Sequence, residues 1–470
     1  MASPVRIPVL AWHGMNVEGS DYSDNDHVAF REDLETIQRL GLQIVPLRTI
    51  AHALRAGNIE GLAGSVGLSF DDGSDFDFHD LPHPTWGVQR GMANILADFR
   101  ARHGAAAQPH LNATCFAIVS PQARRKLDAS CMVGCGWWND DWWPQAQATG
   151  LMDIGNHSWD HDHPMLDATV GGPAGSFQVT SFEQARTEIA QASRYLQQRL
   201  GHDGGVLFAY PYGDVTEFLA EEYLPKHQHE HSVLAAFTTT PAPITASTSV
   251  WRIPRFVFGL HWKRPGELES LLNEHASRPR GASFLARLLR RTEPAPVPAA
   301  PARPSWRECL RTWEVHDARV VAGDLFRRSF GHEVPDYPRH FVTVYSPPPG
   351  EADAAPRVVS YAHQTPFENV HLGGGMCVDA AAYRRMPRWL FEQVREQGGL
   401  ATIVARDSIG MLGDSPASFG HVGEPRARAA DLRTGYVDTG HQHLMVFWRR
   451  ELPASERERL VDRVASLGPF

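Results

Sequence analysis

Short hydrophobic runs alternate with amphipathic stretches over the first 262 residues of the chain. The runs predict strands at 8–12, 43–47, 66–70, 113–119, 207–210 and 233–238. Stretches with apolar residues at a helical spacing predict helices at 28–40, 49–56, 88–102 and 181–200. Strands separated by helices indicate parallel pairing through crossovers, so this region predicts a barrel or an open α/β sheet.

The hydrophobic pattern breaks off at residues 280–304, which pass from a basic amphipathic segment into a Pro/Ala tract. Such a tract favours an extended, semi-rigid spacer. A chain of 470 residues is also too long for one ordinary core. We therefore expect a first domain at 1–280, a linker at 281–304 and a second domain at 305–470.

The pattern in the second domain is that of a smaller α+β fold. Helices are predicted at 306–312 and 381–397. Strands are predicted at 341–345, 357–363, 375–378, 401–405 and 443–448.

Composition excludes several classes of protein. A formal charge of −9 argues against a nucleic-acid partner, because phosphate binding needs a basic surface. No run of eighteen apolar residues is present, so we expect no membrane span. The N-terminus shows no signal-peptide pattern, which predicts a cytoplasmic protein, and the five cysteines are expected to be reduced. Nothing in the sequence specifies an oligomeric state.

Two adjacent carboxylates follow the hydrophobic run at 66–70. The sequence there is LSFDDG, and the carboxylates are Asp71 and Asp72. In folds built from parallel strands the chemistry lies at the carboxyl ends of the strands, which is where this pair falls. Adjacent aspartates before a glycine are, on their own, more typical of a turn.

A second polar cluster, NHSWDH, also follows a short hydrophobic run. His157 and His161 are four residues apart, so on one helical turn both imidazoles would face one metal ion. A carboxylate from another strand end would complete a set of two histidines and one acid. The remaining aspartate could then take a proton from a metal-activated water molecule.

These motifs resemble those of the polysaccharide deacetylase (carbohydrate esterase) family. LSFDDG, NHSWDH and FAYPYG occur in the order and approximate spacing of that family, and PVLAWHG is similar to the start of many members. The resemblance covers about residues 5–262. It implies a distorted (β/α)7-type barrel, a divalent metal that is usually zinc, and hydrolysis of an acetamide to an amine and acetate.

The resemblance also implies roles for individual residues. Asp71 corresponds to the catalytic base, Ser158 to the hydroxyl residue that supports the histidine turn, and Tyr212 to the residue whose backbone N–H holds the developing oxyanion. Tyr210 and Pro211, in the same motif, are expected to contact substrate. The implied metal ligands are Asp72, His157 and His161.

The sequence departs from the family pattern at the third motif and at the general acid. Ala209 stands where an arginine usually steadies the catalytic aspartate. Arg252 or Arg255 could approach from another strand, or both could be solvated. His261 is the best match for the acid, and His13 is a second candidate for the pocket.

The stretch GWWNDDWWPQ contains four tryptophans that have two interpretations. Trp138 and Trp142 could form a stacking platform for sugar rings, because aromatic faces suit the apolar faces of pyranoses. In the alternative interpretation, the tryptophans cover the barrel rim. The expected substrate is a small molecule or an oligosaccharide.

The second domain has a fainter resemblance to acyl-CoA N-acyltransferases of the GNAT type. It rests on the order of elements around GGGMCVD and TGYVDTGHQHLMVFW. AAAYRRMP stands where the glycine-rich pyrophosphate loop is expected. This departure favours a catalytically silent or substrate-holding module over a working transferase.

Three functional hypotheses follow from the sequence. The leading one is a metal-dependent N-deacetylase of an acetylated amino sugar or glycoconjugate. The second keeps the barrel but hydrolyses a non-sugar amide, such as a cyclic imide or ureide. The third is a bifunctional protein whose C-terminal domain transfers an acyl group or binds a partner.

Overall fold

The computed structural model of the chain describes residues 4–166, 174–201, 204–277, 305–349 and 355–470. The described residues form two units. The first contains 4–79, 90–166, 174–201 and 204–277, and the second contains 80–89, 305–349 and 355–470. The predicted linker at 281–304 lies outside the described residues, and the predicted domain boundaries stay predictions.

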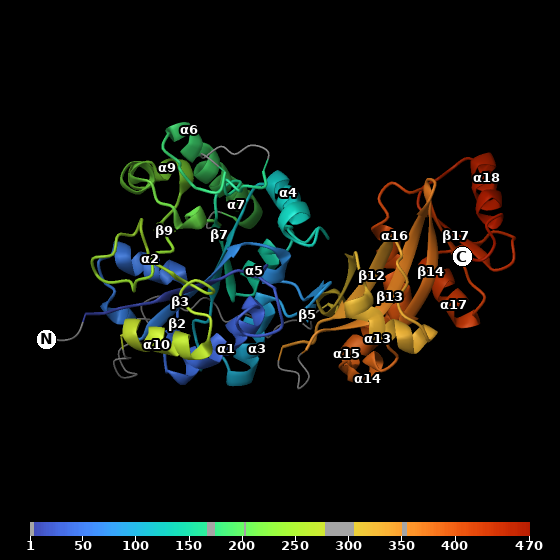
Figure 1. Cartoon of the computed structure of the whole chain (residues 1–470), viewed down its shortest axis with the longest axis horizontal. Coiled ribbons are helices and arrows are strands. Elements are labelled where there is room, and N and C mark those ends of the chain that lie inside the picture. The colour runs from blue at the N-terminus through green and yellow to red at the C-terminus, as the bar shows by residue number, and fades with distance from the viewer. Residues whose placement is uncertain (1–3, 167–173, 202–203, 278–304, 350–354) are drawn as a thin grey trace. The chain divides into compact units, whose positions relative to one another are not determined.

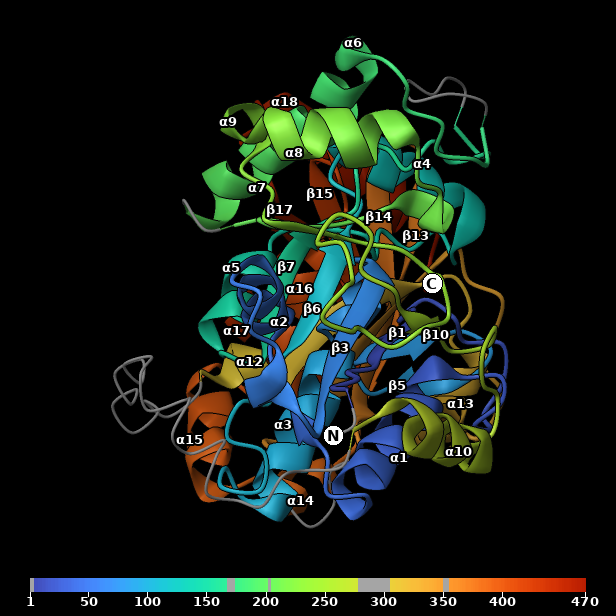
Figure 2. The ribbon, with the colours of Figure 1, turned by 90° about the vertical axis from the view of Figure 1, so that its left-hand side faces the viewer.

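A parallel sheet forms the centre of the first unit (Figures 1 and 2). Its strand order is β10-β1-β3-β6-β7-β8-β9, and β2 (Gln43–Ile44) pairs with the start of β3. The strands are β1 (Val9–Trp12), β3 (Ser65–Asp72), β6 (Ala113–Ala117), β7 (Met152–Asn156), β8 (Leu207–Ala209), β9 (Ala235–Phe237) and β10 (Phe256–Val257). This sheet confirms the parallel α/β architecture predicted from the hydrophobic pattern.

The sheet curves far enough to bring its two ends to one segment. Ile253 forms a parallel bridge with Phe237 at the end of β9. Three residues later, Phe256 of β10 pairs with Leu10 of β1. The same short segment therefore contacts both edges, which closes the sheet into the distorted barrel that was predicted.

Helices cover the outside of this barrel. The predicted helices at 28–40 and 88–102 correspond to α1 (Asp26–Arg39) and α3 (Met92–His103), and α10 (Pro265–His275) follows the last strand. Apolar side chains from all three helices share one core cluster with the sheet. Its largest fully buried members include Trp12, Phe30, Phe70 and Trp262.

The helix predicted from residue 181 begins as the sequence indicates. Ser181 and Gln184 form the expected capping box at the start of α6 (Phe182–Ala185). The helix then passes through the π-helical segment η3 (Arg186–Gln191) before it continues as α7 (Ala192–Leu200). The sequence pattern did not predict the π-helical segment, in which Glu188 is buried.

The second unit contains a seven-stranded sheet of order β11-β12-β13-β14-β15-β17-β16. Its pairs are antiparallel except for β14 and β15, which pair in parallel. The strands are β11 (Leu310–Val315), β12 (Arg339–Tyr345), β13 (Arg357–Phe367), β14 (Val370–Val378), β15 (Ala417–His421), β16 (Val437–Asp438) and β17 (Leu444–Trp448). The helices include α13 (Arg319–Phe330), α15 (Arg388–Glu396), α16 (Leu400–Gly410), α17 (Pro425–Thr434) and α18 (Ala454–Ala465). The expected α+β class is confirmed.

Some predictions for the second unit were wrong. Residues 401–405, predicted as a strand, lie in α16. The helix predicted at 306–312 is found as α12 (Trp306–Cys309), which is shorter than expected because strand β11 begins at Leu310. The predicted helix at 381–397 is interrupted before Pro387, and strand β15 was not predicted. A short apolar run such as ATIVA has no periodicity that separates a buried strand from a buried helix.

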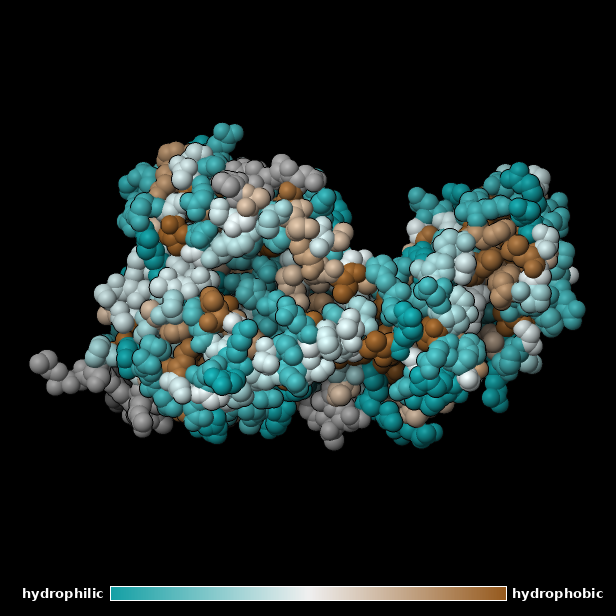
Figure 3. Space-filling view, in the orientation of Figure 1, coloured by the Kyte–Doolittle hydropathy of each residue, from teal (hydrophilic) through white to brown (hydrophobic). Residues whose placement is uncertain are grey.

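None of the helices in the described part of the chain has the length and apolar character needed to span a bilayer. The visible face of each unit is mostly hydrophilic, with hydrophobic residues in small separate patches (Figure 3).

Candidate metal and catalytic site

Three neighbouring strands bring the predicted site residues together. Asp71 and Asp72 are the last residues of β3, and Asp72 is in register with Ala117 of β6. Ala117 is in turn in register with Asn156, the last residue of β7. His157 follows directly, so residues 85 positions apart in the sequence meet at one edge of the sheet because their strands end together.

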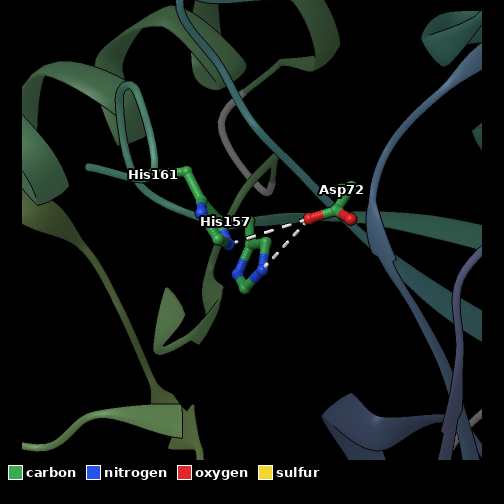
Figure 4. A group of neighbouring side chains, drawn as sticks. All are labelled: Asp72, His157 and His161. Atoms are coloured by element: carbon green, nitrogen blue, oxygen red, sulfur yellow. Dashed lines mark ion pairs between the residues drawn. The ribbon is translucent and has the colours of Figure 1, made fainter. Parts of the chain in front are cut away.

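Asp72, His157 and His161 form a group that could hold a metal ion (Figure 4). The Nε2 atom of each histidine lies 3.7 Å from Oδ1 of Asp72. Two ligands on a tetrahedral zinc ion, with bonds of about 2.0–2.1 Å, are separated by about 3.4 Å. The spacing of these three donor atoms therefore fits a single ion.

The histidine ring nitrogens are arranged for metal binding. Nδ1 of His157 lies 2.9 Å from the carbonyl oxygen of Ala209, which makes Nδ1 the donor and leaves a lone pair on Nε2. Burial lowers the pKa of His157, and it lowers the pKa of His161 further. Both rings are therefore neutral near pH 7, which is the form that binds a metal.

The two histidines are placed by a polar turn and not by the helical turn that was expected. Ser158 and His161 have left-handed φ values of 70° and 68°. Oδ1 of Asn156 accepts the Ser158 N–H at 2.8 Å, and Oγ of Ser158 accepts the His161 N–H at 2.9 Å. Side-chain acceptors thus hold a backbone conformation that non-glycine residues rarely adopt.

Asp71 lies beside the metal group and is held by an arginine. Its two carboxylate oxygens accept from Nη1 and Nη2 of Arg255 at 2.6 and 2.8 Å. Burial alone would raise the pKa of Asp71, but the positive charge of Arg255 and its hydrogen bonds lower it below its ordinary value. Asp71 is therefore ionised at neutral pH, with both oxygens oriented by one planar group.

Comparison with known proteins now places this site in a family. The family model described as polysaccharide deacetylase matches residues 60–224. Residues 60–224 form a polysaccharide deacetylase domain. That range contains Asp71, Asp72, His157 and His161, and it confirms the resemblance seen in the sequence motifs. No curated protein matches the chain.

Solved structures of deacetylases are also similar to this chain. The Streptococcus pyogenes deacetylase PplD, in complex with acetate, is 17% identical, with 59% of this chain and 100% of that chain covered and a TM-score of 0.40. IcaB from Ammonifex degensii is 16% identical, with 57% and 97% covered and a TM-score of 0.39. A polysaccharide deacetylase from Bacillus cereus is 15% identical, with 58% and 70% covered and a TM-score of 0.39.

Arg252 and Arg255 were the two candidates for the arginine that steadies Asp71, and Arg255 is the one that contacts it. Arg252 instead pairs with Glu217 at 2.8 Å near the surface. Arg255 is fully buried, and its Nε donates to the carbonyl oxygen of Thr238 at 3.1 Å. Arg255, directly before β10, therefore makes the contact with Asp71 that the side chain of Ala209 cannot make.

We expect Arg255→Met to destabilise the protein and to raise the pKa of Asp71. Removing one partner of a buried ion pair leaves the other charge uncompensated, at a cost of about 3–5 kcal/mol. Because the folded pKa of Asp71 is lowered, the wild-type pair stabilises the protein above about pH 4 and loses this effect as the pH falls further. Denaturant unfolding and the pH–rate profile measure both effects, and the acid limb should move to higher pH.

Arg252→Met is the matched control for this prediction. Its partner Glu217 has a side chain that is 80% exposed, so losing the pair should cost at most about 1 kcal/mol. Equal losses of stability in the two variants would contradict the importance of the Arg255 pair.

The structure places the two candidate acids differently. His13 lies close enough to Asp71 and His161 to contribute to the lowered pKa of each of them. Nδ1 of His261 accepts the N–H of Val257 at 2.7 Å, and its ring lies 6.1 Å from that of Phe256. Among the described interactions, none joins His261 to Asp71 or Asp72.

Asp26 is a residue of this region that sequence reasoning missed. Its Oδ2 accepts the backbone N–H of His13 at 2.7 Å. Burial raises the pKa of Asp26 to about 7, although the charge of His13 opposes the rise. At the start of a helix an aspartate is ordinarily interpreted as a capping residue, so no sequence signal marked it.

The predicted substrate-binding tryptophans are buried. Trp138 is 4% exposed and donates from Nε1 to the carbonyl oxygen of Asp72 at 3.1 Å. Trp142 is fully buried, donates to Asp75 at 3.0 Å and stacks on Phe78. This burial is what the alternative interpretation, a cover on the barrel rim, expects.

The PYG turn after β8 has one exposed aromatic residue. Tyr210 and Pro211 are buried, and the Tyr210 hydroxyl donates to the carbonyl oxygen of Trp251 at 2.9 Å. Tyr212 is 39% exposed, has a φ of 59°, and places its ring centre 4.5 Å from that of His161. Tyr212 is therefore the member of this turn that lies beside the metal group and open to solvent.

Proposed function

We propose that the barrel is a metal-dependent N-deacetylase that hydrolyses the acetamide of an N-acetylated amino sugar or glycoconjugate. The observation that carries the proposal is the convergence of Asp72, His157 and His161 on one point, with the ionised Asp71 beside them. Two imidazoles and one carboxylate suit zinc and leave positions open for water and substrate. A second acid that is paired with Arg255 remains available for proton transfer.

Each residue has a distinct task in this proposal. A bound zinc ion would polarise the acetyl carbonyl and make water easier to deprotonate. Asp71 accepts the proton of the attacking water, and Arg255 keeps its carboxylate oriented. The backbone N–H of Tyr212 stabilises the oxyanion, and collapse of the tetrahedral intermediate then breaks the carbon–nitrogen bond.

We propose that His13 is the general acid, which donates a proton to the leaving nitrogen. A position near the reacting groups is supported by the contribution of His13 to the lowered pKa of both Asp71 and His161. The hydrogen bond from its backbone N–H to Asp26 fixes its position. His261, the first candidate from sequence, has no such link in the described residues.

Acetate release from a panel of substrates tests the proposed function. The full chain is stripped of metal with a chelator, reloaded with zinc, and incubated with N-acetylated sugars, N-acetylated oligosaccharides and small non-sugar amides. We expect acetate from the sugars with the reloaded protein, and a loss of at least about 100-fold in the stripped protein because the Lewis acid contributes several kcal/mol.

Two outcomes would change the assignment. Equal turnover before and after verified metal removal would contradict the metal dependence. Turnover confined to cyclic imides or ureides would favour the alternative substrate class on the same barrel. The cytoplasmic location and the acyl-transfer or partner-binding role of the second domain stay predictions.

A further inference from the structure

The backbone of Asp72, a proposed metal ligand, has a conformation that non-glycine residues rarely adopt. Its φ is 75°, in the left-handed region, and the φ of the following Gly73 is 74°. A conformation of this kind costs free energy and persists only where the surrounding structure holds it. The groups that hold the backbone of Asp72 therefore also determine where its carboxylate points.

Two donors bind the carbonyl oxygen of Asp72. The backbone N–H of Ile118, directly after β6, donates to it at 3.1 Å, and Nε1 of Trp138 also donates to it at 3.1 Å. A carbonyl oxygen has two lone pairs, so these two donors use both of them. Because this carbonyl lies in the peptide plane between Asp72 and Gly73, the two bonds fix the backbone at the end of β3.

The indole ring of Trp138 is held by its own packing. It is buried in an apolar cluster with Ile118, Ala123 and Leu127. Close packing leaves such a ring one position, so its N–H is directed at Asp72 before any ion is bound. Trp138 therefore supplies a preorganised donor to the backbone of a proposed metal ligand.

Further hydrogen bonds attach the loop of Trp138 to the same turn. Oδ1 of Asp75 accepts from the backbone N–H of Asn139 at 2.7 Å and from Nε1 of Trp142 at 3.0 Å. Oδ2 of Asp75 accepts from Nδ2 of Asn139 at 2.8 Å. The loop is therefore attached to the turn after β3 at two residues, Asp72 and Asp75.

The indole N–H groups of Trp138 and Trp142 differ in what they bind. Both tryptophans are buried, and each donates to an oxygen of the turn after β3. Packing alone explains a buried tryptophan at either position. Of the two oxygens, however, only the one that Trp138 binds belongs to a residue of the metal group. A comparison of the two tryptophans therefore separates support of the loop from support of the metal site.

We propose that Trp138 is a positioning residue for the metal site, because its N–H holds Asp72 in the backbone conformation that directs the carboxylate to the two histidines. His157 and His161 both come from the turn after β7, and only Asp72 comes from β3. The position of Asp72 therefore decides whether all three donor atoms meet on one ion. This inference rests on the metal site of the proposed function, and not on the substrate or the reaction.

Zinc affinity, measured without turnover, tests this role. Trp138→Phe keeps an aromatic ring in the cluster and removes the N–H donor, and Trp142→Phe, which loses the bond to Asp75, is the matched control. Each full-length variant is stripped of metal and titrated with zinc against a competing chelator. We expect zinc binding to weaken by roughly 10- to 100-fold in Trp138→Phe, as it does when an outer partner of a ligand is lost, and to stay at the wild-type level in Trp142→Phe.

Cobalt(II) at the same site gives a second readout, because its visible absorption depends on the arrangement of its ligands. At saturating cobalt, the absorption bands of Trp138→Phe should shift from those of the wild type. A variant that had only lost stability would keep the wild-type bands once it was saturated. The bands of Trp142→Phe should therefore match those of the wild type.

Wild-type zinc affinity and cobalt bands in Trp138→Phe would overturn the proposal, and so would equal losses of zinc affinity in the two variants. If Trp138→Phe does not fold, the wild-type chain gives the test, because coupling between two sites is reciprocal. Zinc should then slow hydrogen exchange of the Trp138 indole N–H more than that of Trp142, and an equal effect on both would contradict the role. A chain that binds zinc but releases no acetate would overturn the deacetylase proposal and leave these results unchanged.

Discussion

Replacing Asp71 by asparagine should abolish hydrolysis while leaving the metal content at the wild-type level. Asp71 is paired with Arg255 and is not one of the three grouped metal ligands. An amide cannot take a proton from water, and a positioned general base contributes roughly 10²–10⁴-fold to the rate. We therefore expect a loss of acetate release of at least about 100-fold, measured together with bound zinc by elemental analysis.

The adjacent aspartate provides the matched control for this result. Asp72→Asn should lose both zinc and activity, because Asp72 faces both histidines. Wild-type turnover in Asp71→Asn would show that another group acts as the base. Loss of zinc in Asp71→Asn would mean that Asp71 takes part in binding the ion.

Replacing His157 by alanine should remove both the metal and the activity. His157 belongs to the group of possible ligands, with Nε2 3.7 Å from Oδ1 of Asp72 and Nδ1 bonded to the carbonyl oxygen of Ala209. Loss of a direct ligand should weaken zinc binding by more than the roughly 10- to 100-fold that an outer partner costs. Zinc titration with a competing chelator measures this loss, and acetate release should fall in parallel.

His52→Ala is a suitable control because His52 is exposed on α2 (Leu47–Arg55) and belongs to none of the described groups of possible metal ligands. This variant should keep its zinc and its turnover. Retention of stoichiometric, tightly bound zinc in His157→Ala would contradict the proposed coordination. Retained zinc with lost activity would instead indicate that His157 serves catalysis without holding the ion.

Local patterns predicted a barrel or an open α/β sheet, and they predicted that the residues of the metal group meet at strand ends. Side-chain periodicity depends on the backbone geometry of a few neighbouring residues, so the strands ending at Asp72 and before His157 could be found from sequence. Parallel strands end at one edge of a sheet, which makes the convergence of these two strand ends predictable before any distance is known.

Other features depended on contacts between distant parts of the chain. Arg252 and Arg255 have the same local character in WRIPRF, but only Arg255 turns inward to Asp71. The tryptophans of GWWNDDWWPQ were consistent with a platform or a cover, and only packing shows that they are buried. A sequence pattern does not specify which of two similar side chains finds a distant partner.

The sequence by itself determined the parallel architecture of the first domain, the family of residues 60–224, and the residue types at the ends of β3 and β7. Only the tertiary structure decided the partner of Asp71, the surroundings of His13 and His261, and the hydrogen bond from Trp138 to Asp72. The physical reason is the separation along the chain between the residues that interact. Strand and helix patterns arise from neighbouring residues, whereas burial, charge pairing and ligand geometry arise from residues that are far apart in the chain and meet only after folding.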